Sequence, residues 1–394
     1  MPQTSSLDNR GRAVRGSATR NGVRLSALAL GLAGLVGLTA CATPADAGES
    51  SQRALGSSLE EVTGLAQEEG KVHLIAYPES WANYGESFDL FTEKYGVEVE
   101  VSNPDGSSAE ELEAVRNLKG QATQPDVLDI GATFTQTAID DGLIQPYKPS
   151  TFDEIPDQLK NADGYWTAAY YGVMSIGVNA NEVDVPKTWM DLKDPQYKGK
   201  IVMGDPREGA SQLAAVFAAG LANGGSIADI SAGIDFFAEL AEQGYLVSAE
   251  SSSQALATGQ AAVMLDWNFN FPGIVDEMEK SGVDLQVATP SDGVFGTYYA
   301  QPLTDQAPQP NAGALWIEWL LSDEGAVTYA KSGAIPARYQ TLVEQDAIPA
   351  DVLAQLPPAD IVAQITFPSA DDNAAATEKI MADWGTKVAA KMGF

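Results

Sequence analysis

The chain predicts an α/β fold, and two patterns along the sequence support this prediction. Short apolar or alternating segments typical of strands recur between segments whose apolar residues follow helical spacing. In the first of two expected units the order is strand, helix, strand, helix, strand, at residues 71–77, 84–95, 97–101, 109–119 and 126–130. Such alternation is typical of a parallel sheet covered by helices.

Local signals set the limits of the first elements. The strand at 71–77 is a short apolar run that Pro78 ends, and the residues at 97–101 alternate strictly between valine and glutamate. The helix between them places Phe88 and Phe91 on one face, and Gly96 ends it.

A second unit begins near residue 170 and repeats the same kinds of element. Its expected strands, together with those that return to the first unit, are 173–178, 200–203, 261–265, 283–289 and 297–301. Its expected helices and those of the closing segment are 211–221, 232–243, 252–258, 312–321 and 324–331.

The N-terminal region predicts export and lipid anchoring. Five arginines precede the apolar run 25–38, and small residues follow it, which is typical of an export signal. The run is too short to span a bilayer comfortably as a helix. Its end, Leu38-Thr39-Ala40-Cys41, resembles the bacterial lipobox, in which the cysteine becomes the lipidated first residue of the mature protein. We therefore expect a signal peptide at 1–40 and a flexible tether at 41–58.

Composition excludes several classes of protein. The formal net charge of −31 disfavours binding to nucleic acid and to anionic lipid headgroups. His73 is the only histidine and lies in an apolar strand, and Cys41 is the only cysteine. The chain therefore has few of the residues that histidine-based catalytic triads, Cys–His dyads and zinc sites need. We expect no enzyme, no cofactor and no resident metal.

Several stretches together resemble one protein family. They are Pro186 to Leu192, Asp194 to Val202, Asp205-Pro206, Ala255 to Val263, Ala307 to Ala312 and Trp319 to Gly325. The chain from residue 59 to 394 resembles the solute-binding proteins of bacterial ABC importers, in the branch that contains ferric-iron and spermidine/putrescine receptors.

This resemblance implies the type II periplasmic-binding-protein fold, with two α/β lobes, two crossover segments and a ligand cleft between the lobes. Lobe one is expected to comprise 59–168 plus 299–394, and lobe two 169–298. The implied protein is a monomer outside the cytoplasmic membrane that delivers a small solute to the permease subunits. Ligands of open α/β sheets bind beyond the carboxyl ends of strands, which independently directs attention to the loops there.

The first two such loops offer aromatic and hydroxyl groups. Glu79, Trp81 and Tyr84 follow the first strand and would hold a cationic or apolar ligand by ring stacking and charge. Alternatively, Trp81 covers the core of the lobe. Thr133 follows the third strand, where a hydroxyl binds an anion or caps the next helix.

The other two loops belong to the second unit. Arg207 and Ser211 lie at a helix start that favours anions, although Arg207 can instead pair with a neighbouring carboxylate. Asp266 and Trp267 end an apolar strand, where a charged residue needs a partner. A tryptophan–asparagine segment at this place helps to hold amines in the spermidine/putrescine receptors.

Tyrosines near the crossovers are further candidates. Tyr171 and Tyr298 each place a ring in the cleft or pack against the hinge.

The expected cargo is a polyamine or a similar organic cation. One alternative is an anion such as a phosphonate or carboxylate, held by Arg207, Ser211 and Thr133. Another is Fe(III), although the tyrosines that the iron receptors present near the fourth loop correspond here to Trp267 and Asn268. A ligand-sensing lipoprotein with the same fold and an extracytoplasmic hydrolase with a carboxylate pair are the alternatives from other classes.

Overall fold

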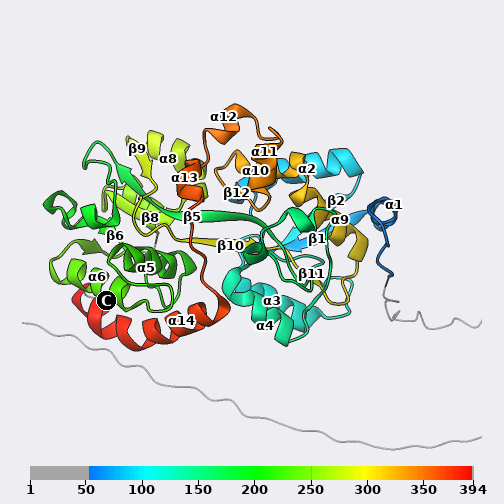
Figure 1. The fold of residues 1–394 in the computed structure, drawn as a ribbon, viewed down its shortest axis with the longest axis horizontal. Coiled ribbons are helices and arrows are strands. Elements are labelled where there is room, and N and C mark those ends of the chain that lie inside the picture. Colours follow the sequence, from blue (N-terminus) through cyan, green and yellow to red (C-terminus); the bar gives the residue numbers. More distant parts are fainter. Residues whose placement is uncertain (1–52, 250, 393–394) are drawn as a thin grey trace, which may run out of the picture. The chain divides into compact units, whose positions relative to one another are not determined.

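The computed structural model describes residues 53–249 and 251–392, and Figure 1 shows their arrangement. The predicted signal peptide and Cys41 lie outside these residues. The strands are β1 (Lys71–Ile75), β2 (Glu98–Ser102), β3 (Ile130–Gly131), β4 (Ile144–Gln145), β5 (Ala168–Asn179), β6 (Ile201–Val202), β7 (Leu246–Val247), β8 (Val263–Trp267), β9 (Leu285–Ala288), β10 (Gly296–Ala300), β11 (Leu303–Thr304) and β12 (Ile335–Pro336).

The helices alternate with these strands, as an α/β fold requires. They are α1 (Leu59–Glu69), α2 (Tyr84–Tyr95), α3 (Ser108–Leu118), α4 (Thr135–Asp140), α5 (Ala210–Ala222), α6 (Ser231–Glu242), α7 (Ser252–Ala257), α8 (Val275–Lys280), α9 (Pro310–Leu321), α10 (Asp323–Ala330), α11 (Tyr339–Glu344), α12 (Ala350–Leu353), α13 (Ala359–Val362), α14 (Ala370–Trp384) and α15 (Ala390–Met392). In the part of the chain that the structure describes, no helix has the length and apolarity that a bilayer crossing needs.

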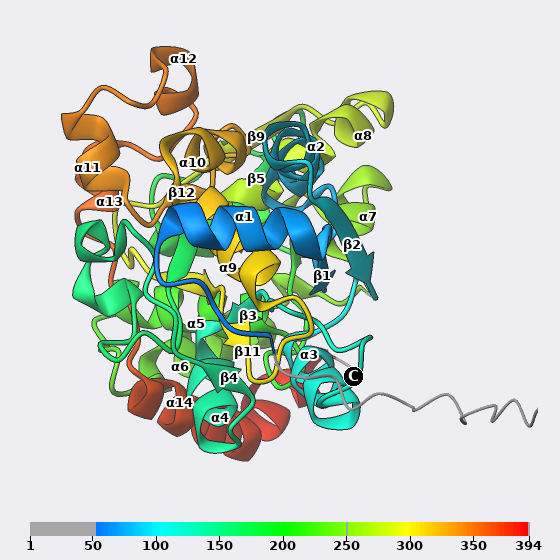
Figure 2. The same cartoon turned by 90° about the vertical axis from the view of Figure 1, so that its right-hand side faces the viewer.

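Lobe one is built around helix α9, with β1, β2, α1, α2 and α3 around it (Figure 2). β1 and β2 pair in parallel, and Val127 bridges to Leu74 beside them. Every residue of α9 is buried, because α1, α2 and β1 all pack against it. The ring of Trp316 lies edge-on to Phe91 of α2, with centroids 5.2 Å apart. Since a buried helix is apolar on all sides, α9 could be predicted from its sequence.

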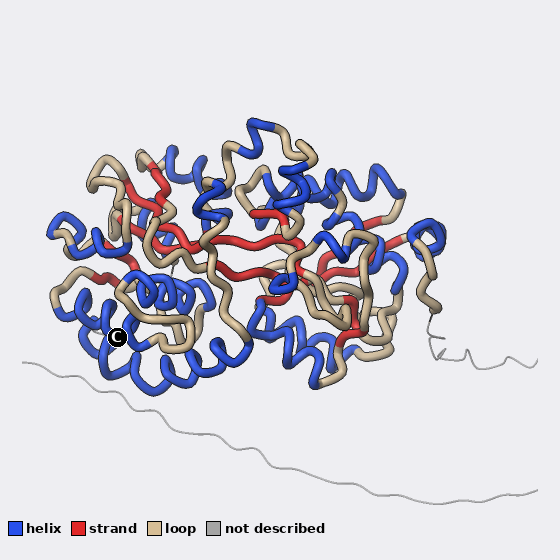
Figure 3. The backbone as a smooth tube through the Cα atoms, in the orientation of Figure 1, coloured by secondary structure: helices blue, strands red, loops and turns tan. Residues whose placement is uncertain are grey.

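Strand β5 runs from lobe one into lobe two (Figure 3). All of its 12 residues are buried. Its first half pairs with β10 and β12, and its second half pairs with β8 and β9, in each case antiparallel. The two lobes are therefore joined through one continuous sheet.

Lobe two contains the parallel strands β6, β7 and β8, with helices α5 to α8 around them. The helices α5 and α6 approach each other closely at Gly233, where an added Cβ would lie 1.9 Å from the carbonyl oxygen of Val216. Only a residue without a side chain fits at this crossing.

The C-terminal segment contacts both lobes. After α13, Thr366 donates its N–H to Val294 and accepts from the N–H of Gly296, beside β10. Helix α14 then packs on α6 of lobe two, where the rings of Trp384 and Phe237 lie 5.9 Å apart. The assignment of 299–394 to lobe one stays a prediction. Helix α14 contacts both Ala132–Phe134 of lobe one and α6 of lobe two, and the residues after it pack on α6. The chain passes between the lobes three times, at β5, at β10 and near Thr366.

The expected strand at 126–130 is also mostly wrong. Only Ile130–Gly131 forms a regular strand, as β3, while Val127 makes isolated bridges to Leu74 and Leu303. The carboxylate of Asp126 accepts the backbone N–H groups of His73 and Gln309. In a regular sheet, backbone carbonyl groups of a neighbouring strand would accept such N–H groups.

The crossing of α5 and α6 leads to a stability prediction. Substitution Gly233→Ala forces a methyl group into the backbone of Val216 and should destabilise the protein by about 3 kcal/mol, as overpacked substitutions do. Urea denaturation should therefore show a lower transition midpoint. The matched control is Gly64→Ala in α1, where no atom lies within 4 Å of the added carbon. It should stabilise by about 0.5–1 kcal/mol. Equal midpoints for Gly233→Ala and the wild type would contradict the close approach of α5 and α6.

Candidate functional site

A cavity of about 650 Å³ lies between the two lobes. Lobe one lines it with the loop after β1, the start of α3, the residues around β3, and Tyr299 of β10. Lobe two lines it with the loop before α5, with α5 itself and with the end of β8, and α14 contributes Asn373 and Thr377. A cavity lined from both lobes is suited to a ligand that both lobes contact.

A buried carboxylate lies in the wall of this cavity that lobe one forms. Asp129, one residue before β3, accepts hydrogen bonds from the hydroxyl groups of Tyr84 at 3.0 Å and Tyr170 at 3.2 Å, and from the side-chain amide of Gln301. Burial raises the pKa of the Asp129 carboxyl to about 7, although these three hydrogen bonds act in the opposite direction. All three donors are neutral, so the carboxylate is oriented without being neutralised.

A second carboxylate lies beside the first. Glu111 of α3 is only 1% exposed and accepts the backbone N–H of Asp129 at 2.8 Å. Burial and the nearby charge of Asp129 raise the pKa of Glu111 well above its usual value. Among the described residues, no lysine or arginine forms an ion pair with either carboxylate. The site thus holds acidic groups that lack a positive partner.

Aromatic rings border this acidic wall. The indole N–H of Trp81 donates to the hydroxyl of Tyr170 at 2.6 Å, so Trp81 is linked through Tyr170 to Asp129. Its ring lies edge-on to Tyr299 and Phe269, with centroids 5.4 Å and 5.3 Å away. Rings beside carboxylates form a surface that suits an organic ammonium group.

The loop that carries Trp81 is strained. Ala76, Ala82 and Asn83 all have positive φ angles, of 60°, 47° and 58°, although none of them is glycine. Left-handed backbone is unfavourable for alanine, and such strain is concentrated at functional sites. The surrounding contacts therefore determine the place of Trp81.

Lobe two contributes hydrogen-bond donors. Helix α5 begins after Gly209 without any side-chain cap, and both Gly209 and Ala210 line the cavity. Arg207 also lines it, but its Nε donates to both carboxylate oxygens of Asp205, at 2.9 Å and 3.0 Å. This pairing lowers the pKa of Asp205 and is one of the two arrangements expected from the sequence.

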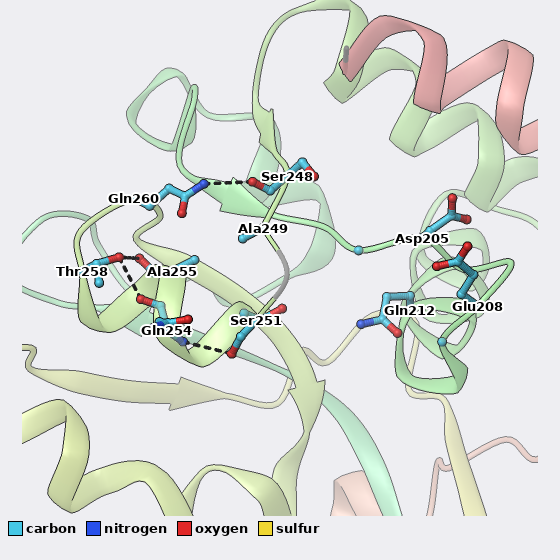
Figure 4. Close-up of a pocket in the computed structure, with 13 residues that line it drawn as sticks. Asp205, Glu208, Gln212, Ser248, Ala249, Ser251, Gln254, Ala255, Thr258 and Gln260 are labelled. Atoms are coloured by element: carbon cyan, nitrogen blue, oxygen red, sulfur yellow. Dashed lines mark hydrogen bonds between the residues drawn. The ribbon is translucent and has the colours of Figure 1, made fainter. Parts of the chain in front are cut away.

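A second hollow, of about 950 Å³, belongs to lobe two alone (Figure 4). Polar side chains dominate its lining, and the carboxylates of Asp205 and Glu208 lie on the side opposite Ser248 and Gln260. It adjoins the cleft at Glu208 and Gly209 but receives no residue from lobe one.

Four of the residues expected to bind ligand line the cavity between the lobes. They are Trp81, Thr133, Arg207 and Trp267. The ring of Trp267 is 1% exposed and faces Phe295, and its indole N–H has no hydrogen-bond partner within the described residues.

The other expected residues lie outside the lining. Tyr84 is fully buried and supports Asp129 from behind, with its ring stacked on Phe88. Glu79 points to solvent, because the loop turns toward Trp81 before α2 begins.

Asp266 and Ser211 lie next to the cavity without lining it. The Asp266 carboxylate accepts from the N–H of Trp267 at 2.8 Å and from the amide of Asn270 at 3.0 Å, and burial raises its pKa. Both of these donors bond Oδ1 of Asp266, and the carboxylate also interacts with the side chain of Ser211 in α5.

Tyr171 and Tyr298 pack where the chain passes between the lobes. The ring of Tyr171 meets Phe367 at 5.5 Å, and the ring of Tyr298 stacks on Trp166 at 5.0 Å. Both therefore take the hinge-packing role that was their alternative.

Sequence reasoning missed Asp129 and Glu111. The sequence held a signal for Asp129, which lies near the end of the apolar run 126–130. Burying a carboxylate there is unfavourable unless a partner group offsets the loss of its hydration, and the same argument was applied to Asp266. Glu111 gave no signal, since one glutamate among several on a helix is ordinary.

The raised pKa of Asp129 predicts how stability depends on pH in the ligand-free protein. The unfolded carboxyl ionises near pH 4 and the native one near pH 7, so the native state binds the additional proton in this window. This contribution to the free energy of unfolding is fully present below pH 4 and is lost as pH rises through 7, by on the order of 4 kcal/mol.

Urea titrations at pH 5 and pH 8 measure this effect. Asp129→Asn should lose less stability between these pH values than the wild type. The control Asp383→Asn should match the wild type, because Lys379 and Lys387 lower the pKa of Asp383 and keep its titration below pH 5. Identical changes for Asp129→Asn and the wild type would show that Asp129 ionises normally.

Two curated relatives share part of the chain. A probable ABC transporter periplasmic-binding protein of Sinorhizobium fredii is 30% identical over 244 residues, which cover 57% of this chain and 63% of that protein. A putative 2-aminoethylphosphonate-binding periplasmic protein of Salmonella typhimurium is 24% identical over 266 residues, 66% of this chain and 74% of that protein. This chain therefore spans slightly less than two thirds of the Sinorhizobium relative.

Solved structures share the fold. The spermidine/putrescine substrate-binding protein of Streptococcus pneumoniae is 15% identical, with a TM-score of 0.63, and the match covers 80% of this chain and 99% of that one. This confirms the expected two-lobe fold. Residues 122–364, more than half of the chain, match the family model described as bacterial extracellular solute-binding protein. The chain belongs to this family, and it is the substrate-binding component of an ABC transporter.

Proposed function

We propose that this chain is the lipid-anchored receptor of an ABC importer and captures a small solute that carries an ammonium group. A polyamine or a similar organic cation is the leading class of cargo. The observation that carries the proposal is the pair of buried carboxyl groups, Asp129 and Glu111, which line the cleft and form no ion pair with a described lysine or arginine. A buried carboxylate without a partner is costly, and a bound cation would supply the missing charge.

The aromatic wall supports the same class of solute. Trp81 and Tyr299 border the acidic groups, and a cation is attracted both to ring faces and to carboxylates. The names of two similar proteins also include amines, namely spermidine and putrescine in one and 2-aminoethylphosphonate in the other.

Capture would proceed by closure of the cleft. The lobes are joined at β5, at β10 and near Thr366, and hinge motions occur at such connections. A solute that touches both walls binds the closed form more tightly, and this difference in affinity drives closure. The closed receptor would then dock on the permease as a monomer.

The alternative cargoes receive less support. An anion alone would lie beside Asp129 and Glu111, whose carboxyl groups repel it when they are ionised. Fe(III) would need phenolate ligands, but Tyr170 and Tyr299 have their pKa values raised by burial, and the hydroxyl of Tyr170 is bonded between Trp81 and Asp129.

Other classes of function are distinguished by experiment. A hydrolase would turn over its ligand, whereas a receptor returns it unchanged, and His73 lies in β1 rather than in the lining of the cleft. A receptor that only signals would bind the solute without supporting its uptake.

The first prediction concerns the acidic wall. Thermal unfolding of the mature protein against putrescine, spermidine, Fe(III)-citrate, phosphonates, sugars and amino acids should show stabilisation by amine-bearing compounds. Asp129→Asn should then weaken the best amine by about 30-fold or more in calorimetry, because it removes a buried charge partner. The control Asp383→Asn removes a carboxylate that pairs with Lys379 and Lys387 outside the lining of the cleft, so it should leave amine affinity nearly unchanged. Unaltered amine binding by Asp129→Asn would reject the proposal.

The second prediction concerns anchoring. Cys41 lies outside the described residues, and the lipobox-like sequence before it is the basis for this part of the proposal. Cys41→Ser should abolish acylation and move the protein from the membrane fraction to the soluble extracytoplasmic fraction, because acyl chains supply the membrane affinity. Fractionation with mass spectrometry of the N-terminal peptide measures this. Retention of the variant in the membrane fraction would argue for a different anchor.

A further inference from the structure

The polarity of the cleft differs between its two sides. Lobe one presents the acceptors Asp129 and Glu111, as described above. The start of α5 in lobe two and helix α14, which contacts both Ala132–Phe134 and α6, present donors, and one of these is a side-chain amide.

That side chain is Asn373 of α14. It lines the cavity and is only 7% exposed. Its backbone N–H donates to Ser369 and its carbonyl accepts from the hydroxyl of Thr377, but within residues 53–249 and 251–392 its side-chain amide has no hydrogen-bond partner. Its polar atoms reach the cavity, so they are available to a group of the ligand.

The start of α5 supplies further donors to the same cavity. Gly209 provides no side-chain cap, and in the described part of the chain the N–H groups of Ala210, Ser211 and Gln212 have no acceptor. Such N–H groups and the helix dipole favour negatively charged groups. Since α5 has 13 residues, its dipole is well developed.

Three carboxylates lie near the start of α5. They belong to Asp205, to Glu208, which lines both hollows, and to Asp266, which is hydrogen-bonded to Ser211. Asp205 is paired with Arg207, so these two charges offset each other. The carboxylate of Glu208 is exposed and, in Figure 4, lies beside that of Asp205 at the second hollow.

We infer that the cargo is a zwitterion, in which an acid group, carboxylate or phosphonate, is bound by Asn373 and the start of α5 while the ammonium group is bound at Asp129. The inference rests on the proposed function for the ammonium end. If Asn373 binds the acid group, this residue distinguishes an amino acid or aminophosphonate from a diamine of the same length.

Compounds of matched length test the class of ligand. Calorimetry on the mature wild type should show 4-aminobutyrate or 3-aminopropylphosphonate binding at least about tenfold more tightly than 1,4-diaminobutane and butylamine, because hydrogen bonds to a charged group are strong. The order of the carboxylate and the phosphonate identifies the acid group. A diamine that binds as tightly as both zwitterions would overturn the inference and leave the ammonium proposal intact. Butyrate that binds as tightly as 4-aminobutyrate would instead overturn the ammonium end.

Variants of α14 test the residue. Asn373→Ala should weaken the tighter zwitterion about tenfold and leave butylamine unchanged. Asn373→Asp should reverse the preference in favour of 1,4-diaminobutane, because a carboxylate repels the acid group and attracts the second ammonium. Ala375→Asp adds the same charge on the exposed side of the same helix and should keep the wild-type preference. If Asn373→Asp and Ala375→Asp alter the ratio of the two affinities equally, Asn373 does not contact the acid group and the inference is wrong.

Discussion

The buried strand β5 is the constraint on which both lobes and the cleft depend. Its first half belongs to the sheet of lobe one and its second half to that of lobe two. Tyr170 on this strand donates to Asp129, and the N–H of Val173 donates to Asn268 in the loop after β8. The acidic wall and the opposing loop are therefore positioned from one backbone, and closure of the cleft has to be accommodated by a bend of β5 and β10 together.

The acidic wall trades stability for binding. Asp129 and Glu111 are held by neutral donors and by a backbone N–H, none of which cancels a negative charge. The ligand-free protein is thereby destabilised when these groups are ionised, which is a common cost of functional sites. An ammonium group would remove much of this cost, so the same feature that weakens the free protein strengthens its complex. The strained backbone of the Trp81 loop is likewise unfavourable for the free protein and positions a ring in the cleft.

The return of the C-terminal helix to lobe two changes how the cleft is completed. The segment near Thr366 pairs beside β10, and α14 continues onto α6. A third connection between the lobes restrains their motion more than two would. The same helix brings Asn373 to the cavity, so a residue near the end of the chain takes part in a site whose other groups lie far away in sequence.

The sequence by itself determined the α/β class, most of the long helices and the family, because periodic patterns, glycine stops and clustered motifs are local properties of the chain. It also directed attention to the loops at Trp81, Thr133, Arg207 and Trp267, which line the cleft. It did not distinguish Asp129, which lines the cavity, from Asp266, which does not, since both end apolar segments. The tertiary structure alone decided this, and it also decided that α14 packs on α6, because a side chain's partners are set by the packing of elements distant along the chain.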